Sequence, residues 1–146
     1  AYRAKESGFD GIELMVSAGY LLSQSLSPLT NKRQDKYGGD LQKRMTFLLN
    51  IISKIKKRTG KDYPLFCRLG GNDFMEGGNT HEDSKIIAAA TEKAGIDSFN
   101  VVGGWHGATI PDVPMCVPRG AFVYLAKGIK EVVSVPVVAS RMTMGM

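Results

Sequence analysis

Two side chains in this sequence are suited to handling a proton at a reacting centre, Tyr20 and His106. Tyr20 follows an apolar run and the short turn Ser17-Ala18-Gly19, and a phenol is a weak acid that can donate a proton to a carbanion. His106 follows Gly103-Gly104-Trp105, and glycines let a loop turn sharply and bring an imidazole over a pocket. The alternatives are a packed tyrosine ring with a solvated hydroxyl and a loop histidine bonded to the backbone.

Arg68 is a third candidate because it lies inside the apolar run from Leu65 to Leu69. Desolvating an unpaired guanidinium is costly, so Arg68 must meet an anion or a set of acceptors. The alternative is a partly exposed arginine in an ion pair with Asp73 or Glu76. Arg141 comes directly after the last apolar run.

Short apolar runs that alternate with helical patterns must position these groups. We expect strands at residues 11–16, 63–69, 98–102 and 135–140. The expected helices are 1–7, 41–59 between the caps Asp40 and Gly60, 80–95 opened by Thr80 and Asp83, and one from Arg119 through Phe122 and Ile129. Residues 15–39 look like one long loop after the first strand. The alternation predicts parallel βαβ units, whose strand carboxyl ends carry catalytic groups in barrel enzymes.

The pattern predicts an α/β fold that is part of a TIM (β/α)8 barrel. We count about four parallel strands with connecting helices, whereas a complete eight-unit barrel needs about 250 residues. We therefore expect residues 1–146 to be a single fragment of a larger barrel domain. Unpaired outer strands invite association, so the isolated piece is expected to pair with another copy unless other chain covers them.

Two segments resemble one enzyme family. The run from Met15 through Tyr20, followed by Leu26-Ser27-Pro28 and Asn31-Lys32-Arg33, is similar to the active-site signature of the Old Yellow Enzyme family of NADH:flavin oxidoreductases. The segments 103–111 and 117–122 point to its 2,4-dienoyl-CoA reductase and 2-enoate reductase branch. By this resemblance the chain would span the fourth to seventh βα units of an FMN-binding barrel.

The resemblance also implies roles for individual residues. Tyr20 would be the proton donor, helped by His106, while Arg68 would face the flavin and Arg141 would lie near its phosphate. The loops that contact substrate would contribute Thr30, Gly107, Ala108, Thr109 and Ile110. FMN would be the cofactor and NAD(P)H the reductant. An iron–sulfur cluster and FAD are possible in the full-length protein, but the cysteine run for the cluster is not in this chain.

Two positions depart from the family pattern. Typical members place a histidine and a second histidine or asparagine just before the tyrosine, where this chain has Met15 and Ala18. Met15 agrees with the dienoyl-CoA reductase branch, but that branch usually has a glutamate at the position of Ala18. A carboxylate in the proton relay is therefore not expected here, and the choice of substrate can differ.

The charge is concentrated in one segment. Ten Lys or Arg lie between Lys32 and Lys61 against Asp35 and Asp40, in a chain of net charge +5. This is either a solvated helix face with its loop or an attraction for a phosphorylated ligand such as a coenzyme A ester. No aromatic-studded basic groove suggests nucleic acid. The two histidines are not spaced as metal ligands, and no apolar stretch approaches a membrane span, so we expect no metal, no membrane and a cytoplasmic protein.

The leading hypothesis is an FMN-dependent NAD(P)H oxidoreductase, an ene-reductase that acts on the activated C=C of an enoate or an enoyl- or dienoyl-CoA. One alternative is an amine dehydrogenase of the same family, which needs an aromatic cage for a cationic amine. The other is an inactive structural fragment of the barrel. A small-molecule substrate and a possible homo-oligomer are the expected partners.

Overall fold

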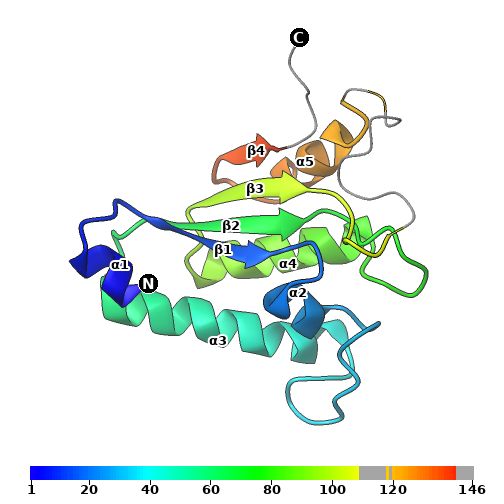
Figure 1. The fold of residues 1–146 in the computed structure, drawn as a ribbon, viewed down its shortest axis with the longest axis horizontal. Helices are drawn as coiled ribbons and strands as arrows, with labels where there is room; N and C mark the ends of the chain where they lie inside the picture. Colours follow the sequence, from blue (N-terminus) through cyan, green and yellow to red (C-terminus); the bar gives the residue numbers. More distant parts are fainter. Residues whose placement is uncertain (109–117, 119, 141–146) are drawn as a thin grey trace.

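Four parallel strands form a single sheet in the order β1-β2-β3-β4, with helices between them (Figure 1). The computed structural model describes residues 1–108, 118 and 120–140. The strands are β1 (Ile12–Val16), β2 (Leu65–Gly70), β3 (Ser98–Val102) and β4 (Val137–Ala139). The helices are α1 (Tyr2–Glu6), α2 (Leu21–Leu26), α3 (Leu41–Thr59), α4 (His81–Ala94) and α5 (Val123–Lys130). The predicted parallel α/β arrangement is confirmed.

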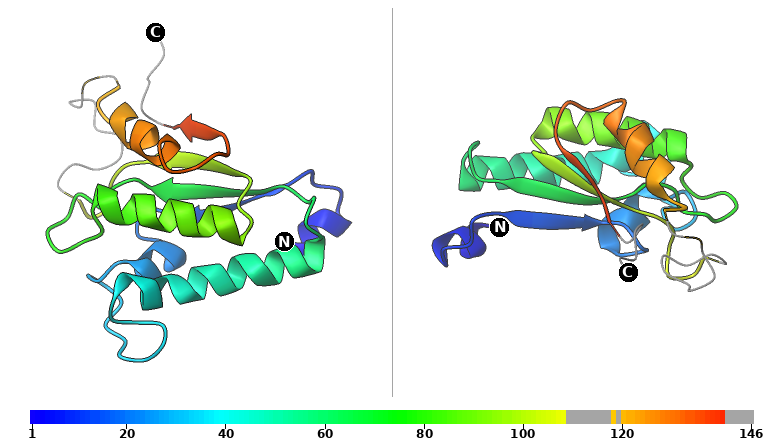
Figure 2. Two further views of the ribbon diagram at one scale, coloured as in Figure 1. Left: turned by 180° about the vertical axis from the view of Figure 1, so that it is seen from behind. Right: turned by 90° about the horizontal axis from the view of Figure 1, so that it is seen from above.

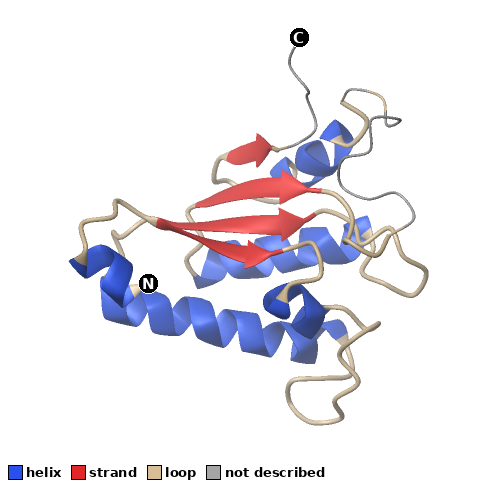
Figure 3. Ribbon diagram, in the orientation of Figure 1, coloured by secondary structure: helices blue, strands red, loops and turns tan. Residues whose placement is uncertain are grey.

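The helices α3, α4 and α5 lie on the same face of the sheet, as the view from above in Figure 2 and the colours of Figure 3 show. Side chains alternate along each strand. Leu65, Cys67 and Leu69 of β2 point into the core between sheet and helices and are buried. The intervening Phe66 and Arg68 point to the opposite face, which we call the inner face because it would line a closed barrel.

Helix ends follow the predicted capping signals. Asp40 caps α3 by accepting a hydrogen bond from the backbone N–H of Lys43 at 2.9 Å, and Gly60 ends that helix with φ of 92°. Thr80 and Asp83 form the expected capping box of α4, which ends at Gly95 in the left-handed conformation. In the described part of the chain, no helix has both the length and the apolar character required to cross a bilayer.

Several boundaries differ from those expected. β2 begins after Pro64 and β4 after Pro136, because proline has no N–H to donate to a ladder. α5 begins at Val123, with Phe122 as its N-cap, and the expected start near Arg119 lies outside the described residues. The helix α2 was not predicted, since residues 15–39 were expected to form a loop. Its six residues are too few to show a helical period.

The main core lies between the sheet and α3, α4 and α5. Its fully buried members include Leu48 and Ile52 of α3, Ile87 of α4, and Phe99 and Val101 of β3. Burial of these apolar side chains is the dominant favourable contribution to folding. This layer fixes where the strands end, and therefore where the loops that follow them lie.

Leu48→Ala is expected to lower the free energy of unfolding by about 2–5 kcal/mol, because it removes a fully buried side chain and leaves a cavity. Chemical denaturation measures this. Ser53→Ala, at an exposed position of the same helix, is the control and should change stability by less than about 0.5 kcal/mol. Equal losses in the two variants would contradict the assignment of the core.

Candidate active site

The turn after β1 places Tyr20 at the carboxyl end of the sheet. Ala18 and Gly19 both have positive φ, 59° and 86°, so the chain reverses within two residues. The Ser23 hydroxyl accepts a hydrogen bond from Gly19 N at 3.0 Å and donates one to Ser17 O at 3.1 Å. α2 begins immediately after Tyr20. The tyrosine is therefore held between a constrained turn and a helix.

The chain after β3 crosses the end of β2 and reaches this turn. Gly71 N donates to Val102 O at 2.7 Å and Gly104 N donates to Asn72 O at 2.9 Å, which ties the two loops together. Trp105 then forms a parallel β-bridge with Ala18. The ends of β1 and β3 thus meet although β2 lies between these strands.

Tyr20 and His106 come together at this junction. The hydroxyl oxygen of Tyr20 lies 3.4 Å from Nε2 of His106, and the two rings contact edge to face at 5.5 Å between centroids. Both side chains are exposed, Tyr20 to 51%. The structure therefore brings together the two residues that were predicted to act jointly, and leaves them accessible to a substrate.

Arg68 shares a small pocket with these two residues. The pocket holds about 70 Å³ and is lined by Met15, Ser17, Ala18, Tyr20, Arg68, Val102 and His106. The ion-pair partner of Arg68 is Glu13, with 2.9 Å between Nε and Oε1. The expected alternative partners, Asp73 and Glu76, are wrong. β1 and β2 are neighbours in the sheet and both residues are on the inner face, whereas Asp73 is committed to other bonds.

The predicted substrate-contacting residues fall in different places. Gly107 and Ala108 directly follow His106, and Ala108 is buried with its N–H bonded to Trp105 O at 3.0 Å. Thr30 does not line the pocket of Tyr20 and His106. Thr109, Ile110 and Arg141 lie outside the described residues.

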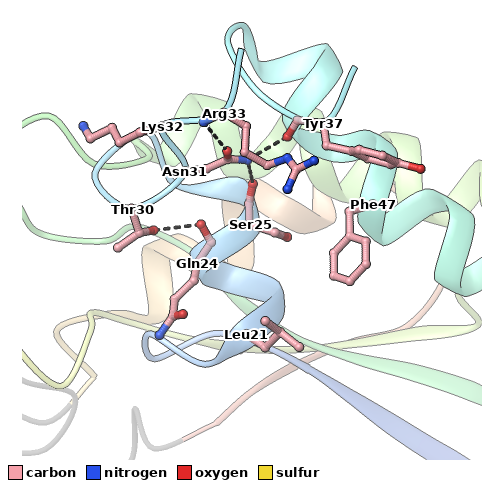
Figure 4. Close-up of a pocket in the computed structure, with 9 residues that line it drawn as sticks. All are labelled: Leu21, Gln24, Ser25, Thr30, Asn31, Lys32, Arg33, Tyr37 and Phe47. Carbon is pink, nitrogen blue, oxygen red and sulfur yellow. Dashed lines mark hydrogen bonds between the residues drawn. The ribbon is translucent and has the colours of Figure 1, made fainter. Parts of the chain in front are cut away.

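Thr30 instead lines a second, larger pocket of about 500 Å³ beside α2 (Figure 4). Its wall consists of Leu21, Gln24, Ser25, Thr30, Asn31, Lys32, Arg33, Tyr37 and Phe47. Most polar groups there already have partners within the chain. Asn31 Nδ2 donates to Ser25 O and Tyr37 O at 2.6 and 2.7 Å, and Thr30 donates to Gln24 O at 2.7 Å. These bonds hold the loop in shape next to the tyrosine.

Asp73, which was considered from the sequence only as a possible partner of Arg68, is a buried carboxyl behind the site. It accepts hydrogen bonds from the Ser27 hydroxyl at 2.9 Å and from Asn79 N at 2.8 Å. Burial raises the pKa of Asp73, and these two bonds together with the nearby indole N–H of Trp105 lower it by less. The indole nitrogen is buried and does not reach Asp73 in hydrogen-bond geometry, so its effect is through proximity. Asp73 thus ties the loop after α2, through Ser27, to the loop between β2 and α4.

The site also includes Glu13, which sequence reasoning missed. The sequence did contain a signal for it, because Glu13, like Arg68, is a charged residue inside a predicted strand. Two opposite charges in neighbouring parallel strands pair when both point to the same face. The strand register sets Glu13 opposite Phe66 and Met15 opposite Arg68. Only this register shows that Glu13 and Arg68 point to the same face.

The whole described site lies within a match to one protein family. Residues 1–144 match the family described as NADH:flavin oxidoreductase / NADH oxidase. The chain belongs to this family. The Old Yellow Enzyme resemblance and the partial barrel are thereby confirmed.

Individual relatives carry different names. A metal reductase of Desulforamulus reducens is 54% identical over 95% of this chain and 21% of its own length. An N,N-dimethylglycine/sarcosine dehydrogenase of Chromohalobacter salexigens is 41% identical over 94% of the chain and 21% of its own length. The solved complex of a 2-naphthoyl-CoA reductase with 2-naphthoyl-CoA has a TM-score of 0.92 and 38% identity, covering 98% of this chain and 22% of that one. The chain therefore spans about a fifth of the length of these relatives.

The described residues fit the flavin that the family implies. Among them, Arg68 Nε and Asn100 Oδ1 are buried on the inner face without a hydrogen-bond partner. Arg68 nevertheless lines the pocket of Tyr20 and His106, and its positive charge suits a ring that gains negative charge on reduction. Arg68 is thus a described residue whose charge and position fit FMN, and its role toward the flavin stays a prediction.

Asp73→Asn tests the buried carboxyl. Because the folded-state pKa of Asp73 is raised, the folded protein keeps this proton at pH values where the unfolded chain has lost it. Wild-type stability relative to the Asn variant should therefore be greatest below about pH 4, near the ordinary aspartate pKa, and should fall as the pH rises through the raised pKa. Denaturant unfolding at a series of pH values measures the difference. A difference that is independent of pH would contradict the raised pKa.

Proposed function

We propose that this chain is part of the FMN-binding barrel domain of an NAD(P)H-dependent ene-reductase that acts on the activated C=C of an enoate or an enoyl- or dienoyl-CoA. The observation that carries the proposal is the approach of the Tyr20 hydroxyl to His106 Nε2 at 3.4 Å, over a pocket that Arg68 also lines. An acid, its hydrogen-bonding partner and a cation then converge at the carboxyl ends of parallel strands.

Each of these side chains has a defined task in the proposed reaction. FMN, when bound, supplies the hydride. Tyr20 donates its phenolic proton to the neighbouring substrate carbon, so that the two hydrogens end on adjacent carbons. His106, in contact with both Tyr20 and solvent, returns a proton to the phenolate. Arg68 would help to hold the flavin and would supply positive charge for a ring that becomes electron-rich on reduction.

The likeness to a 2-naphthoyl-CoA reductase supports an acyl-CoA as the substrate class, at 38% identity and a TM-score of 0.92. The cationic residues of the segment 32–44, which follows α2 and begins α3, support it further, because they lie near the site and can attract the phosphates of coenzyme A. The cations from Lys54 to Lys61 lie at the other end of α3, next to the amino end of β2, and are not part of this argument. Lys32 is exposed at the pocket beside α2, whereas Arg33 is already paired with Asp35. The attraction is therefore expected to be long-range and sensitive to salt.

An amine dehydrogenase is the second candidate, supported by the sarcosine dehydrogenase relative at 41% identity. Such a reaction needs aromatic faces around a cationic amine. Trp105 is only 9% exposed and packs against the turn at Gly19, so its face is not available. Among the described residues that line the pocket, Tyr20 and His106 are the aromatic side chains, and their rings contact each other edge to face instead of presenting two opposed faces to an amine. This geometry favours the ene-reductase.

Tyr20→Phe in the FMN-loaded full-length protein is expected to slow oxidation of reduced flavin by an enoyl-CoA by about 10²–10⁴-fold, because the proton donor is lost. Reduction of the flavin by NADH should keep its rate, since that step needs no proton from Tyr20. Stopped-flow absorbance separates the two half-reactions. Tyr2→Phe, at an exposed position on α1, is the control and should change neither rate. An unchanged oxidative rate in Tyr20→Phe would reject the proposed role.

The substrate class is tested with a panel of partners for the full-length protein. NADH-reduced enzyme is mixed with an enoyl-CoA, the matching free enoate, or chelated ferric iron, and oxidised enzyme is mixed with sarcosine. We expect rapid flavin oxidation by the enoyl-CoA and no flavin reduction by sarcosine. Faster flavin reduction by sarcosine than by NADH would favour the amine dehydrogenase, and oxidation by ferric iron alone would exclude C=C reduction as the main activity.

A further inference from the structure

Three polar residues form a cluster on the inner face of the sheet, Glu13 of β1, Arg68 of β2 and Asn100 of β3. Glu13 Oε1 lies 2.9 Å from Arg68 Nε, and Glu13 Oε2 accepts a hydrogen bond from Asn100 Nδ2 at 2.9 Å. The register sets Arg68 directly opposite Asn100, while Glu13 lies one inner-face position closer to the amino end of β1 than Met15, the partner of Arg68. The Glu13 carboxylate therefore connects the side chains of three neighbouring strands. We call these residues the inner-face cluster.

The inner-face cluster lies directly beneath the candidate active site. Arg68 lines the small pocket with Tyr20 and His106, whereas Glu13 and Asn100 line a separate pocket of about 300 Å³ with Phe66, Ser98, Phe99 and Val138. Arg68 is thus the member that reaches the site, and Glu13 acts on the site only through Arg68. A change at Glu13 alters the charge next to the site without removing a group that lines it.

The contact between Glu13 and Arg68 is electrostatic rather than a complete hydrogen bond. The two atoms are 2.9 Å apart, but the buried Nε–H of Arg68 has no hydrogen-bond partner among the described residues. The two side chains are 30% and 31% exposed, so water screens the pair only in part. Glu13 therefore offsets the charge of Arg68 at close range.

We propose that Glu13 is a positioning residue that sets the net positive charge presented by Arg68, and through it the reduction potential of the flavin; this inference rests on the proposed function. A bound flavin gains negative charge on reduction, and the Arg68 cation favours that form. The Glu13 carboxylate disfavours the reduced flavin. The reduction potential therefore depends on the opposing effects of Arg68 and Glu13. Asn100 holds the carboxylate in place by donating to its second oxygen.

The sign of the effect separates this role from a purely structural one. If Glu13 only held Arg68 in place, neutralising Glu13 would loosen the cation, weaken its hold on reduced flavin and lower the potential. If Glu13 offsets charge, the isosteric Glu13→Gln removes the negative charge and raises the potential. Glutamine keeps an oxygen that can accept the hydrogen bond from Asn100.

The experiment is an anaerobic redox titration of the FMN-loaded full-length protein. For Glu13→Gln we expect reduced FMN to bind about tenfold tighter relative to oxidised FMN than in the wild type, which corresponds to about 30 mV for a two-electron couple. Arg68→Gln should shift the potential in the opposite direction. Glu82→Gln removes an equal charge from the exposed end of α4 and should leave the potential unchanged.

Each outcome decides the inference. A potential that is unchanged or lowered in Glu13→Gln overturns it, while the proposed function stands if the wild type holds FMN. A wild-type protein that binds no FMN overturns the proposed function and this inference together. If Glu13→Gln does not fold, Glu13→Asp replaces it; this keeps the charge but withdraws it from Arg68, and a smaller upward shift is expected. No upward shift in that variant overturns the inference as well.

Discussion

The packing of Trp105 against the turn after β1 is the constraint on which the candidate site depends. β1 and β3 are separated by β2, so their loops meet only because the chain after β3 crosses the end of β2. A Cβ added at Gly19 would lie 3.2 Å from the indole ring, and the positive φ there also disfavours a side chain. A larger residue would push the two loops apart. The weak contact between Tyr20 and His106 follows from this packing and does not create it.

Buried polar side chains also fix the position of the loop after α2. The Arg44 guanidinium of α3 is buried and donates to Leu26 O at 2.5 Å and to Gly39 O at 2.6 Å, the two ends of that loop. Asp73 holds Ser27 from the other side. A buried charge is costly unless its donors or acceptors are satisfied, and here the satisfied bonds all run to backbone or side chains of the site loops. The long segment before α3 is therefore held in place by hydrogen bonds to buried side chains.

Local signals in the sequence predicted the fold well, and non-local geometry was harder to predict. The caps at Asp40 and Thr80 act within one helical turn, so a short motif was enough to place α3 and α4. α2 was missed because a six-residue helix stabilised by neighbouring turns has no period of its own. The meeting of Tyr20 with His106 came from family resemblance, since residue spacing alone cannot show that two loops cross. The alternative partners considered for Arg68, Asp73 and Glu76, are wrong because the pairing with Glu13 depends on strand register, which the sequence does not state.

The electrostatics of the inner-face cluster depend on what covers that face. Met15, Phe66 and Val138 expose 37%, 37% and 53% of their surface beside the cluster, although apolar side chains on a barrel interior are normally packed. An ion pair that faces water contributes little, whereas the same pair at lower dielectric acts strongly on its surroundings. The cover that the apolar side chains require would therefore also strengthen the influence of Glu13 on Arg68. Burying the inner face would then both close the barrel and strengthen the effect of the Glu13 charge on Arg68.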